Sequence, residues 1–377
     1  MPTKAPLFND RGAFAFRLLC CSEPAGCPGK DGGSAFAEDG QGGLDMFDQA
    51  KFTIFAGSGG RAFAERMCAY MGCELGSSEV IRFSEGNSFV RINESVRDRD
   101  VFLVQPIGQH ANDEFVEILF WMDAFKRASA NRCTLIMPYF GYAKGDKKDE
   151  PRVSIRARVC ADCMELAGCD HFVTMDLHAP QIQGFFKKPM DHLYAMPLLA
   201  EYMRRRGVEN AVVVSPDAGY AKTARKFAAL LGLPVAIGDK ARADHSESAK
   251  VLELIGEVEG KNAIIVDDFS ISGGTLVDLA RCLKNRGVQK ICACLSHNIV
   301  SERGVQRIND SPIDLVVSTD TVDNEHIIGQ PKFETLSAAP MFAETIKRFY
   351  NYQSIDRMFT ELPSDVYEAG VMLAKTI

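Results

Sequence analysis

The stretch NAIIVDDFSISGGTL, residues 262–276, contains the change of pattern that decides the fold class. Its apolar run AIIV lacks polar alternation, which is typical of a strand covered by helices on both faces. Asp267 and Asp268, here called the acidic pair, follow this run, and the loop Ser-Gly-Gly-Thr at residues 272–275 then opens a helical pattern. A strand, a loop and a helix in this order predict one unit of a parallel α/β sheet.

The same alternation of patterns extends along most of the chain. Apolar, β-rich runs recur as FTIF, DVFLVQ, CTLIMPYF, HFVTMDLH, AVVVSPD, PVAIGD, NAIIVDD, KICACLSH and DLVVSTD. Segments between them, such as RAFAERMCAYMG and AKTARKFAALLG, have apolar residues at spacings of three and four and end in Gly, as helices do. Because VFLVQP to TLIMPYF in the first half resembles AIIVDD to ICACLSH in the second, we expect a duplicated domain with two parallel sheets flanked by helices.

The length of the chain also predicts a division. A chain of 377 residues exceeds what one compact core usually holds, so we expect two domains of about 150 residues each. Residues 1–49 are rich in Gly and small polar residues and predict a flexible extension; their acidic residues argue against an organellar transit peptide. We place the domains and a C-terminal tail at 50–195, 196–345 and 346–377.

Composition excludes several classes of protein. A formal charge of -7 gives no basic surface for nucleic acid, and no apolar run reaches the roughly 18 residues of a membrane span. Most of the 12 cysteines lie in apolar or helical runs, which predicts a reducing compartment, the cytoplasm. Cys160 and Cys163 form a C-x-x-C, but no second pair completes a zinc site, so we expect core packing there.

The loop after the acidic pair has the composition of a phosphate site. Carboxylates at the carboxyl end of a parallel strand accept hydrogen bonds from sugar hydroxyls or hold Mg²⁺. Gly273 and Gly274 let the backbone approach a phosphate, and the helix start supplies N–H groups. Ser272 and Thr275 add hydroxyl donors. The alternative is an ordinary strand-to-helix turn with a capping Ser, but the adjoining acidic pair favours a ligand site.

Two other strand ends carry similar residues. MDLHAPQIQGFF, residues 175–186, places Asp176 and His178 after an apolar run, and SPDAG, residues 215–219, does the same with Asp217. Alone, such a His is usually structural and such an Asp is usually a helix cap. Three strand ends with acidic or imidazole groups together predict one site for a metal or a polyphosphate.

Positive charge is concentrated in two loops. These are YAKGDKKDEPRVSIRAR, residues 142–158, and DKARADHSES, residues 239–248, which contains Lys240 and Arg242. The charged side chains of such loops usually contact only water and bind no ligand. A loop that closes over a transferring phosphoryl group nevertheless needs this composition, because Lys and Arg stabilise the charge of the transition state.

From about Phe52 to Phe359 the chain resembles the ribose-phosphate diphosphokinases (phosphoribosyl diphosphate synthetases). The motifs that carry the resemblance are RFSEG, NESVRDRDVFLVQ, KRASA, MPYFGYA with DKK, AGCDHFVTMDLHAPQIQGFF, VSPDAG, VDD with SGGT, and LSAAPMFAETIKR. The resemblance implies two tandem phosphoribosyltransferase-like α/β domains and a homo-oligomer, either dimer or hexamer. It also implies a Mg²⁺-dependent transfer of the β,γ-diphosphate of ATP to the C1 hydroxyl of ribose 5-phosphate, giving 5-phosphoribosyl 1-diphosphate and AMP.

The resemblance further implies a role for each matching residue. His178 and Asp217 would coordinate the Mg²⁺ carried by ATP, and Lys240 and Arg242 would be catalytic, stabilising the migrating diphosphate. The other contacts to ATP would be Phe83, Glu85, Asn87, Lys144 and Asp146. Ribose 5-phosphate would be held by Asp267, Asp268, Ser272, Gly273, Gly274 and Thr275. An allosteric phosphate or ADP site would include Ser95, Arg97, Arg152 and Ser354.

Departures from the family pattern leave an alternative open. Ile271 and Ser272 stand where the common loop has a third acid and a Thr, Lys144 and Gly145 replace an Arg-Gln pair, Asn87 replaces a Glu, and Tyr220 replaces a Gly. The changes at Ile271, Lys144 and Gly145 are compatible with a catalytically weak or inactive regulatory subunit of the same family. The retained metal, acidic and basic residues favour an enzyme. A phosphoribosyltransferase is disfavoured by the doubled domain and by the 175–186 run.

Overall fold

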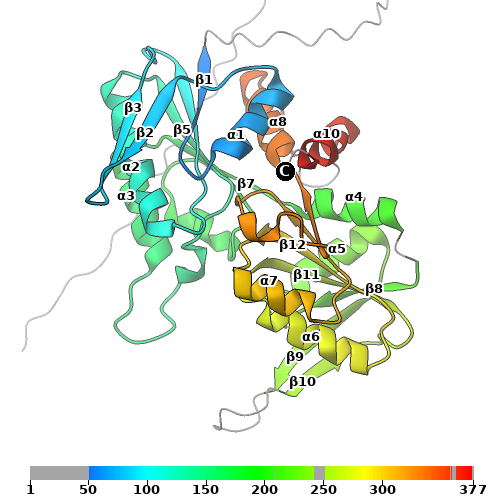
Figure 1. Cartoon of the computed structure of the whole chain (residues 1–377). Helices are drawn as coiled ribbons and strands as arrows, with labels where there is room; N and C mark the ends of the chain where they lie inside the picture. Colours follow the sequence, from blue (N-terminus) through cyan, green and yellow to red (C-terminus); the bar gives the residue numbers. More distant parts are fainter. Residues whose placement is uncertain (1–50, 208, 242–250, 357, 359–361, 376–377) are drawn as a thin grey trace, which may run out of the picture. The chain divides into compact units, whose positions relative to one another are not determined.

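Five parallel strands form the first sheet, in the order β1-β4-β5-β6-β7 (Figure 1). The computed structural model describes residues 51–207, 209–241, 251–356, 358 and 362–375. The strands of the first sheet are β1 (Phe52–Ala56), β4 (Asp100–Val104), β5 (Arg132–Met137), β6 (His171–Met175) and β7 (Met190–Leu193). The predicted extension at residues 1–49 lies outside the described residues.

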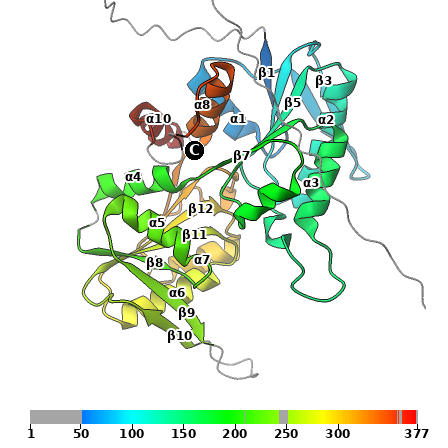
Figure 2. The same ribbon diagram turned by 180° about the vertical axis from the view of Figure 1, so that it is seen from behind.

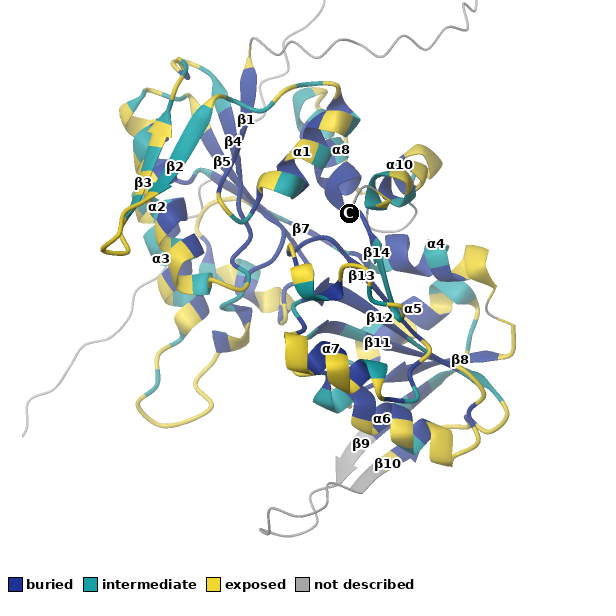
Figure 3. Cartoon of the chain, in the orientation of Figure 1, coloured by how far each residue is buried: buried dark blue, intermediate teal, exposed yellow. Residues whose placement is uncertain are grey.

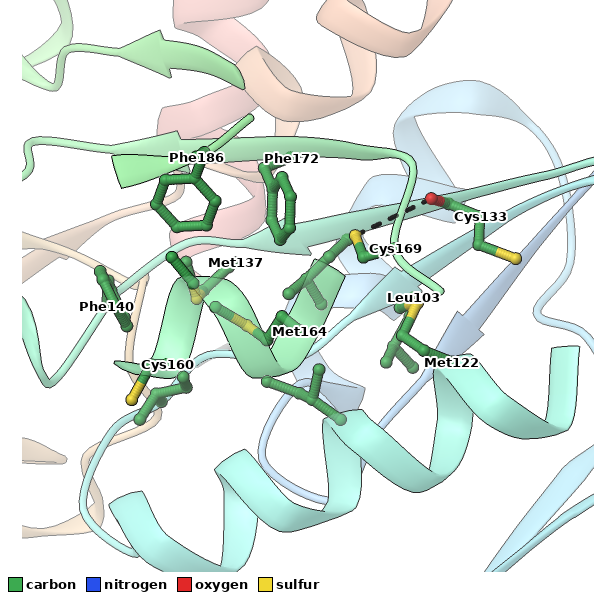
Figure 4. Close-up of a cluster of buried hydrophobic side chains, with 14 of the residues drawn as sticks. Leu103, Met122, Cys133, Met137, Phe140, Cys160, Met164, Cys169, Phe172 and Phe186 are labelled. Carbon is green, nitrogen blue, oxygen red and sulfur yellow. Dashed lines mark hydrogen bonds between the residues drawn. The ribbon is translucent and has the colours of Figure 1, made fainter. Parts of the chain in front are cut away.

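Helices on the first sheet bury an aromatic and sulfur-rich core. They are α1 (Arg61–Met71), α2 (Ala111–Arg127) and α3 (Arg156–Ala167). The ring of Phe55 lies 5.9 Å from Trp121 and 5.1 Å from Phe125, centroid to centroid, and Figure 4 shows Met122 of α2 and Met164 of α3 in the same core. Two antiparallel strands, β2 (Ser78–Arg82) and β3 (Ser88–Ile92), form a separate hairpin that the sequence did not predict.

Seven strands form the second sheet, in the order β10-β9-β8-β11-β12-β13-β14. All neighbours are parallel apart from the antiparallel pair β9 and β10. The strands are β8 (Ala211–Ser215), β9 (Val235–Ala241), β10 (Val251–Ile255), β11 (Asn262–Ser270), β12 (Ile291–Asn298), β13 (Leu315–Thr319) and β14 (Phe333–Leu336). The flanking helices are α4 (Met196–Arg206), α5 (Ala221–Leu231), α6 (Gly274–Asn285) and α7 (Glu302–Asn309) (Figure 2).

The fold class predicted from the apolar runs is confirmed. The central strands of both sheets are largely buried, whereas exposed residues lie on the outer faces of the helices and in the loops (Figure 3). Gly72 and Gly232, which end α1 and α5, have φ of 69° and 66°, a left-handed conformation that favours glycine. None of the helices in the described ranges combines the length and the apolar composition needed to cross a bilayer.

Helix α8 (Ala339–Tyr350) follows the second sheet in sequence but packs on the first. The Phe342 ring lies 5.3 Å from Phe63 of α1, and the Tyr350 hydroxyl donates to the Asp100 carboxylate of β4 at 2.8 Å. Residue 345, the predicted end of the second domain, therefore lies inside a helix that joins the two halves. Both sheets belong to one unit, Asp48–Ile377, which also includes α10 (Ser364–Ala374).

Replacing Phe342 by Ala should destabilise the protein by about 3–5 kcal/mol, because its ring is fully buried between α8 and α1 and the cavity left behind would not collapse. The midpoint of urea unfolding measures this change. Tyr352→Ala is the matched control, since Tyr352 follows α8 and its side chain is 99% exposed. Equal stability of the two variants would show that α8 does not hold the first sheet.

Candidate active site

The acidic pair lies within β11, close to its carboxyl end. The sequence placed the pair after the strand, but β11 continues to Ser270 because its ladder with β12 continues, with Asp267 opposite Leu295 and Phe269 opposite His297. On the other side, pairing with β8 stops at Ile265. The edge of β11 that carries the acidic pair is thus free of strand partners on the β8 side.

A short hydrogen bond joins the predicted nucleotide half to the acidic pair. His178 Nδ1 lies 2.6 Å from Asp268 Oδ2, and Nδ1 must be the donor because a carboxylate only accepts. This bond raises the pKa of His178 above its ordinary value, against the opposing effect of burial. With Nδ1 occupied, Nε2 is the nitrogen left to face a ligand, the usual arrangement for a metal-binding or phosphate-binding histidine.

Lys144 and Asp146 also lie beside this histidine. Lys144 belongs to the short 3-10 helix η1 (Ala143–Gly145), and its Nζ lies 4.2 Å from the centroid of the Phe269 ring, a cation–π contact. The charge of Lys144 lowers the pKa of His178, and the charge of Asp146 raises it. The His178 ring also lies 5.9 Å from the Phe269 ring, centroid to centroid, so two of the predicted ATP-binding residues, Lys144 and His178, contact one aromatic ring.

The carboxylates at this site are crowded. The pKa of Asp267 is raised well above its ordinary value, first by burial, then by Asp268, and also by the charge of Asp217. The charge of Asp217 thus acts on the acidic pair, while its Oδ1 accepts a hydrogen bond from Tyr220 N at 3.0 Å. Buried carboxylates that repel one another are stabilised when a cation binds between them.

Asp176 supports the turn that carries His178. Its φ is 36°, and its carboxylate accepts hydrogen bonds from Ala195 N at 2.9 Å and from Ser296 Oγ at 2.5 Å. Burial raises the pKa of this carboxyl to about 6. The Asp176 carboxylate is therefore bonded to the protein, and Ser296 is a supporting residue that sequence reasoning missed although it stands at the end of a predicted strand.

The predicted phosphate loop opens α6. Gly273 has φ of 68°, and a Cβ there would meet Ile308 at 3.1 Å, so both the conformation and the space favour glycine. Arg307 Nη1 donates to the Ser272 carbonyl at 3.0 Å and lies 3.2 Å from the Cβ position of Gly274. Sequence reasoning missed Arg307, because only the folding of α7 beside α6 brings this cation to the loop.

A cavity of 790 Å³ opens beside the acidic pair. Its lining includes His178, Asp268, Tyr194, Tyr220, Lys222 and Lys226. Tyr220 also lines an inner cavity of 20 Å³ with Asp176 and Asp267. Burial, followed by the charges of Asp176, Asp268 and Asp267, raises the pKa of Tyr220 well above its usual range. Tyr220, whose phenol is neutral, thus lines both cavities.

Other predicted residues do not join this cluster in the described structure. Phe83, Glu85 and Asn87 are exposed at the tip of the β2–β3 hairpin, where Phe83 N donates to Asn87 O at 2.8 Å. Lys240 is a residue of β9, and Arg242 falls outside the described residues. The predicted allosteric residues are all exposed: Ser95, Arg97, Arg152 and Ser354.

Acid should weaken the fold near this site through His192. Its Nε2 accepts a hydrogen bond from Leu177 N at 2.8 Å, and burial, with a smaller effect of His297, lowers its pKa to about 4. The unfolded chain therefore binds more protons than the native state between pH 4 and 6.5. The free energy of unfolding decreases as the pH is lowered through that window. From pH 7.5 to pH 5 this group should remove about 2 kcal/mol of unfolding free energy.

Urea unfolding of the wild type and of His192→Gln at both pH values isolates this effect, because glutamine does not titrate. We expect the wild type to lose more unfolding free energy than the variant by that amount. The same loss in both proteins would show that His192 is not held neutral.

Comparisons with known proteins find members of one family that match most of the chain. The family model described as the N-terminal domain of ribose phosphate pyrophosphokinase matches residues 52–168, and that of the phosphoribosyl synthetase-associated domain matches residues 243–360. The ribose-phosphate pyrophosphokinase of Clostridium acetobutylicum is 42% identical over 310 residues, which cover 82% of this chain and 97% of that protein. That of Thermotoga maritima is 41% identical over 309 residues, with 81% and 97% covered.

A solved structure is also similar. The crystal structure of phosphoribosylpyrophosphate synthetase from Mycobacterium smegmatis superposes with a TM-score of 0.75 and 34% identity, covering 80% of this chain and 99% of that one. Matches of this identity over nearly the whole length of the relatives, together with the two family models, show that the chain belongs to the ribose-phosphate pyrophosphokinase family.

Proposed function

We propose that this chain transfers the β,γ-diphosphate of ATP to the C1 hydroxyl of ribose 5-phosphate, giving 5-phosphoribosyl 1-diphosphate and AMP. The observation that carries the proposal is the 2.6 Å contact between His178 and Asp268. It places a histidine of the predicted nucleotide side next to a carboxylate of the predicted sugar side. A donor phosphate and an acceptor hydroxyl bound to these two residues would be neighbours, as direct transfer requires.

On the nucleotide side, His178, Lys144 and Asp146 would contact the phosphates of ATP. Among the described residues no three His, Cys, Asp or Glu side chains form a metal-binding group. This fits Mg²⁺ that arrives on ATP, because protein-bound Mg²⁺ usually takes only one or two side chains and completes its shell with phosphate oxygens and water. His178 and Asp217 would supply those side chains, and the ion would neutralise phosphate charge.

On the acceptor side, the acidic pair would hold the ribose hydroxyls and residues 272–275 would hold the 5-phosphate. The start of α6 supplies N–H groups, and Arg307 adds a full positive charge beside them. The exposed Ile271 stands at this loop without a polar group to offer. Arg307 would therefore add a polar contact at a loop where Ile271 offers none.

The proposed reaction is an in-line displacement at phosphorus. The C1 oxygen forms a bond to the β-phosphorus and its hydroxyl proton passes to solvent, while the bond from that phosphorus to the α,β-bridging oxygen breaks and AMP leaves with this oxygen. Charge builds on the migrating group, and Lys240 and Arg242 would stabilise it. Positioning and charge stabilisation are sufficient for such transfers without a dedicated general base.

The exposed hairpin tip supports a homo-oligomer as part of the proposal. Phe83 is 44% exposed, and in the described structure its hydrogen-bond and ring contacts stay within the hairpin, with Asn87 and Phe89. An exposed aromatic ring beside Glu85 suits an adenine ring bound at a neighbouring copy of the chain. The free thiols of the described cysteines support placing this enzyme in the cytoplasm.

Removing the Arg307 side chain should raise the KM for ribose 5-phosphate about tenfold while changing the KM for ATP little, because one charge-assisted contact to phosphate is lost. Steady-state kinetics of Arg307→Ala measures both constants. Arg303→Ala is the matched control, since Arg303 is exposed on the same helix. Equal effects on both substrates would place Arg307 outside the sugar-phosphate site.

Chromatography of the nucleotide product tests the proposed reaction. The full-length protein is incubated with ATP and Mg²⁺, with and without ribose 5-phosphate. AMP that forms only with the sugar supports the proposal, whereas ADP would indicate a simple kinase. Absence of turnover would favour the alternative of a regulatory subunit, which a mixture with an active family member would then test.

A further inference from the structure

Two cysteine thiols meet at the end of α1, away from the proposed active site. Cys68 is in the last turn of the helix and Cys73 follows it, with Gly72 between them in a left-handed conformation at φ 69°. Cys73 N donates to Cys68 O at 3.1 Å, the six-to-one hydrogen bond of a Schellman ending. Side chains at these two positions of such an ending normally touch, so the backbone itself brings the thiols together.

The two thiols differ in exposure and in acidity. Cys68 is 4% exposed, whereas Cys73 is half-buried and lines a surface cavity of 310 Å³ that also includes Arg99. The interaction between the two thiols lowers the pKa of Cys73 and raises that of Cys68, and burial also raises the pKa of Cys68. Cys73 is therefore the thiol that a small oxidant reaches and that gives up its proton, while Cys68 remains behind it.

We propose that Cys68 and Cys73 form a reversible disulfide on exposure to hydrogen peroxide. The Cys73 thiolate attacks a peroxide oxygen, the O–O bond breaks, and one water leaves after protonation. The sulfur of Cys68 then attacks the resulting sulfenic acid, the S–O bond breaks, and a second water leaves with the Cys68 proton. The two thiols thereby lose two electrons, which reduce one peroxide molecule.

Backbone hydrogen bonds hold the segment around the two cysteines. The Cys73–Cys68 backbone hydrogen bond already holds the two residues together. The following segment is fixed separately, since Gly76 N donates to Ile54 O of β1 at 2.8 Å and Ser77 N donates to Glu94 Oε1 at 2.6 Å. Cys160 and Cys163 of α3, by contrast, lie a turn apart on one helix, so Cys163 serves as a reference thiol.

Peptide mapping of the full-length protein tests the proposal. Cys68 and Cys73 fall in one tryptic peptide, residues 67–82, so a disulfide appears there as the loss of two hydrogens and as resistance to alkylation. We expect this change in the wild type and in the control Cys163→Ser after peroxide treatment, with reversal by dithiothreitol. Alkylation of both cysteines at a peroxide dose that oxidises Cys163 would overturn the proposal, as would a link from Cys73 to another peptide.

Single variants test the order of the two steps. In Cys68→Ser the sulfenic acid has no partner, so dimedone should label Cys73. In Cys73→Ser the buried Cys68 should remain unlabelled. Labelling of Cys68 in Cys73→Ser, or no labelling of Cys73 in Cys68→Ser, would contradict the assignment of Cys73 as the reacting thiol.

Discussion

Replacing Asp268 by Asn is expected to lower kcat/KM by about 100-fold, the upper range for losing a partner that orients a ligand-binding histidine. The Asn amide oxygen can still accept the His178 Nδ1–H, but it carries no negative charge, so the 2.6 Å bond that orients the histidine ring becomes weaker. The same change removes one proposed acceptor of the ribose hydroxyls. Steady-state kinetics with each substrate varied in turn measures the loss.

Stability separates this loss of activity from unfolding. Asp268 helps to raise the pKa of the buried Asp267, so the two carboxylates repel each other. Asp268→Asn should therefore be at least as stable as the wild type, as expected when a functional site stores unfavourable charge. Asp278→Asn, an exposed position on α6, is the control and should keep full activity. Activity of Asp268→Asn within threefold of the wild type would contradict the proposed site.

Replacing Lys240 by Ala should lower kcat by about 1,000-fold with little change in the KM for ATP. A cation that contacts the migrating diphosphate stabilises mainly the transition state. Arg242→Ala should behave similarly. Lys240 is the sixth residue of β9, and β9 pairs β8, whose carboxyl end leads to Asp217. Lys240 therefore belongs to a strand that neighbours the strand leading to Asp217, a proposed ligand of Mg²⁺.

The kinetic pattern of Lys240→Ala distinguishes catalysis from binding. Lys290→Ala, an exposed lysine before β12, is the charge-matched control and should retain wild-type kcat. If the variant binds ATP weakly but turns over at the wild-type rate, Lys240 contributes to binding of ATP in the ground state and not to the transition state. A kcat equal to that of the control would remove the basic loop from the mechanism.

The fold was predictable where apolar runs form buried central strands. Both sheets follow from these runs, but short strands with mixed sequence were missed, among them β7 (Met190–Leu193) and β14 (Phe333–Leu336). Edge strands bury one side, so their sequences lack a continuous apolar signal. The position of α8 also could not be predicted, because the apolar pattern of an amphipathic helix indicates which face is buried but not which sheet that face covers.

The candidate site was predictable residue by residue but not as a set of contacts. Strand-end positions identified His178, Asp217 and the acidic pair, since ligands bind at the carboxyl ends of parallel strands. The bond between His178 and Asp268 spans 90 positions of sequence, and Arg307 reaches its loop from 35 positions away. No local pattern encodes such distances; they follow from how the two sheets and their helices pack.

Phosphorus NMR of a reaction with the full-length protein, Mg²⁺, ATP and ribose 5-phosphate shows directly where the diphosphate goes. We expect AMP and a sugar that carries a diphosphate on C1 and a phosphate on C5, in equal amounts. ADP with a singly phosphorylated C1, or ATP left intact in the presence of the sugar, would contradict the proposed transfer.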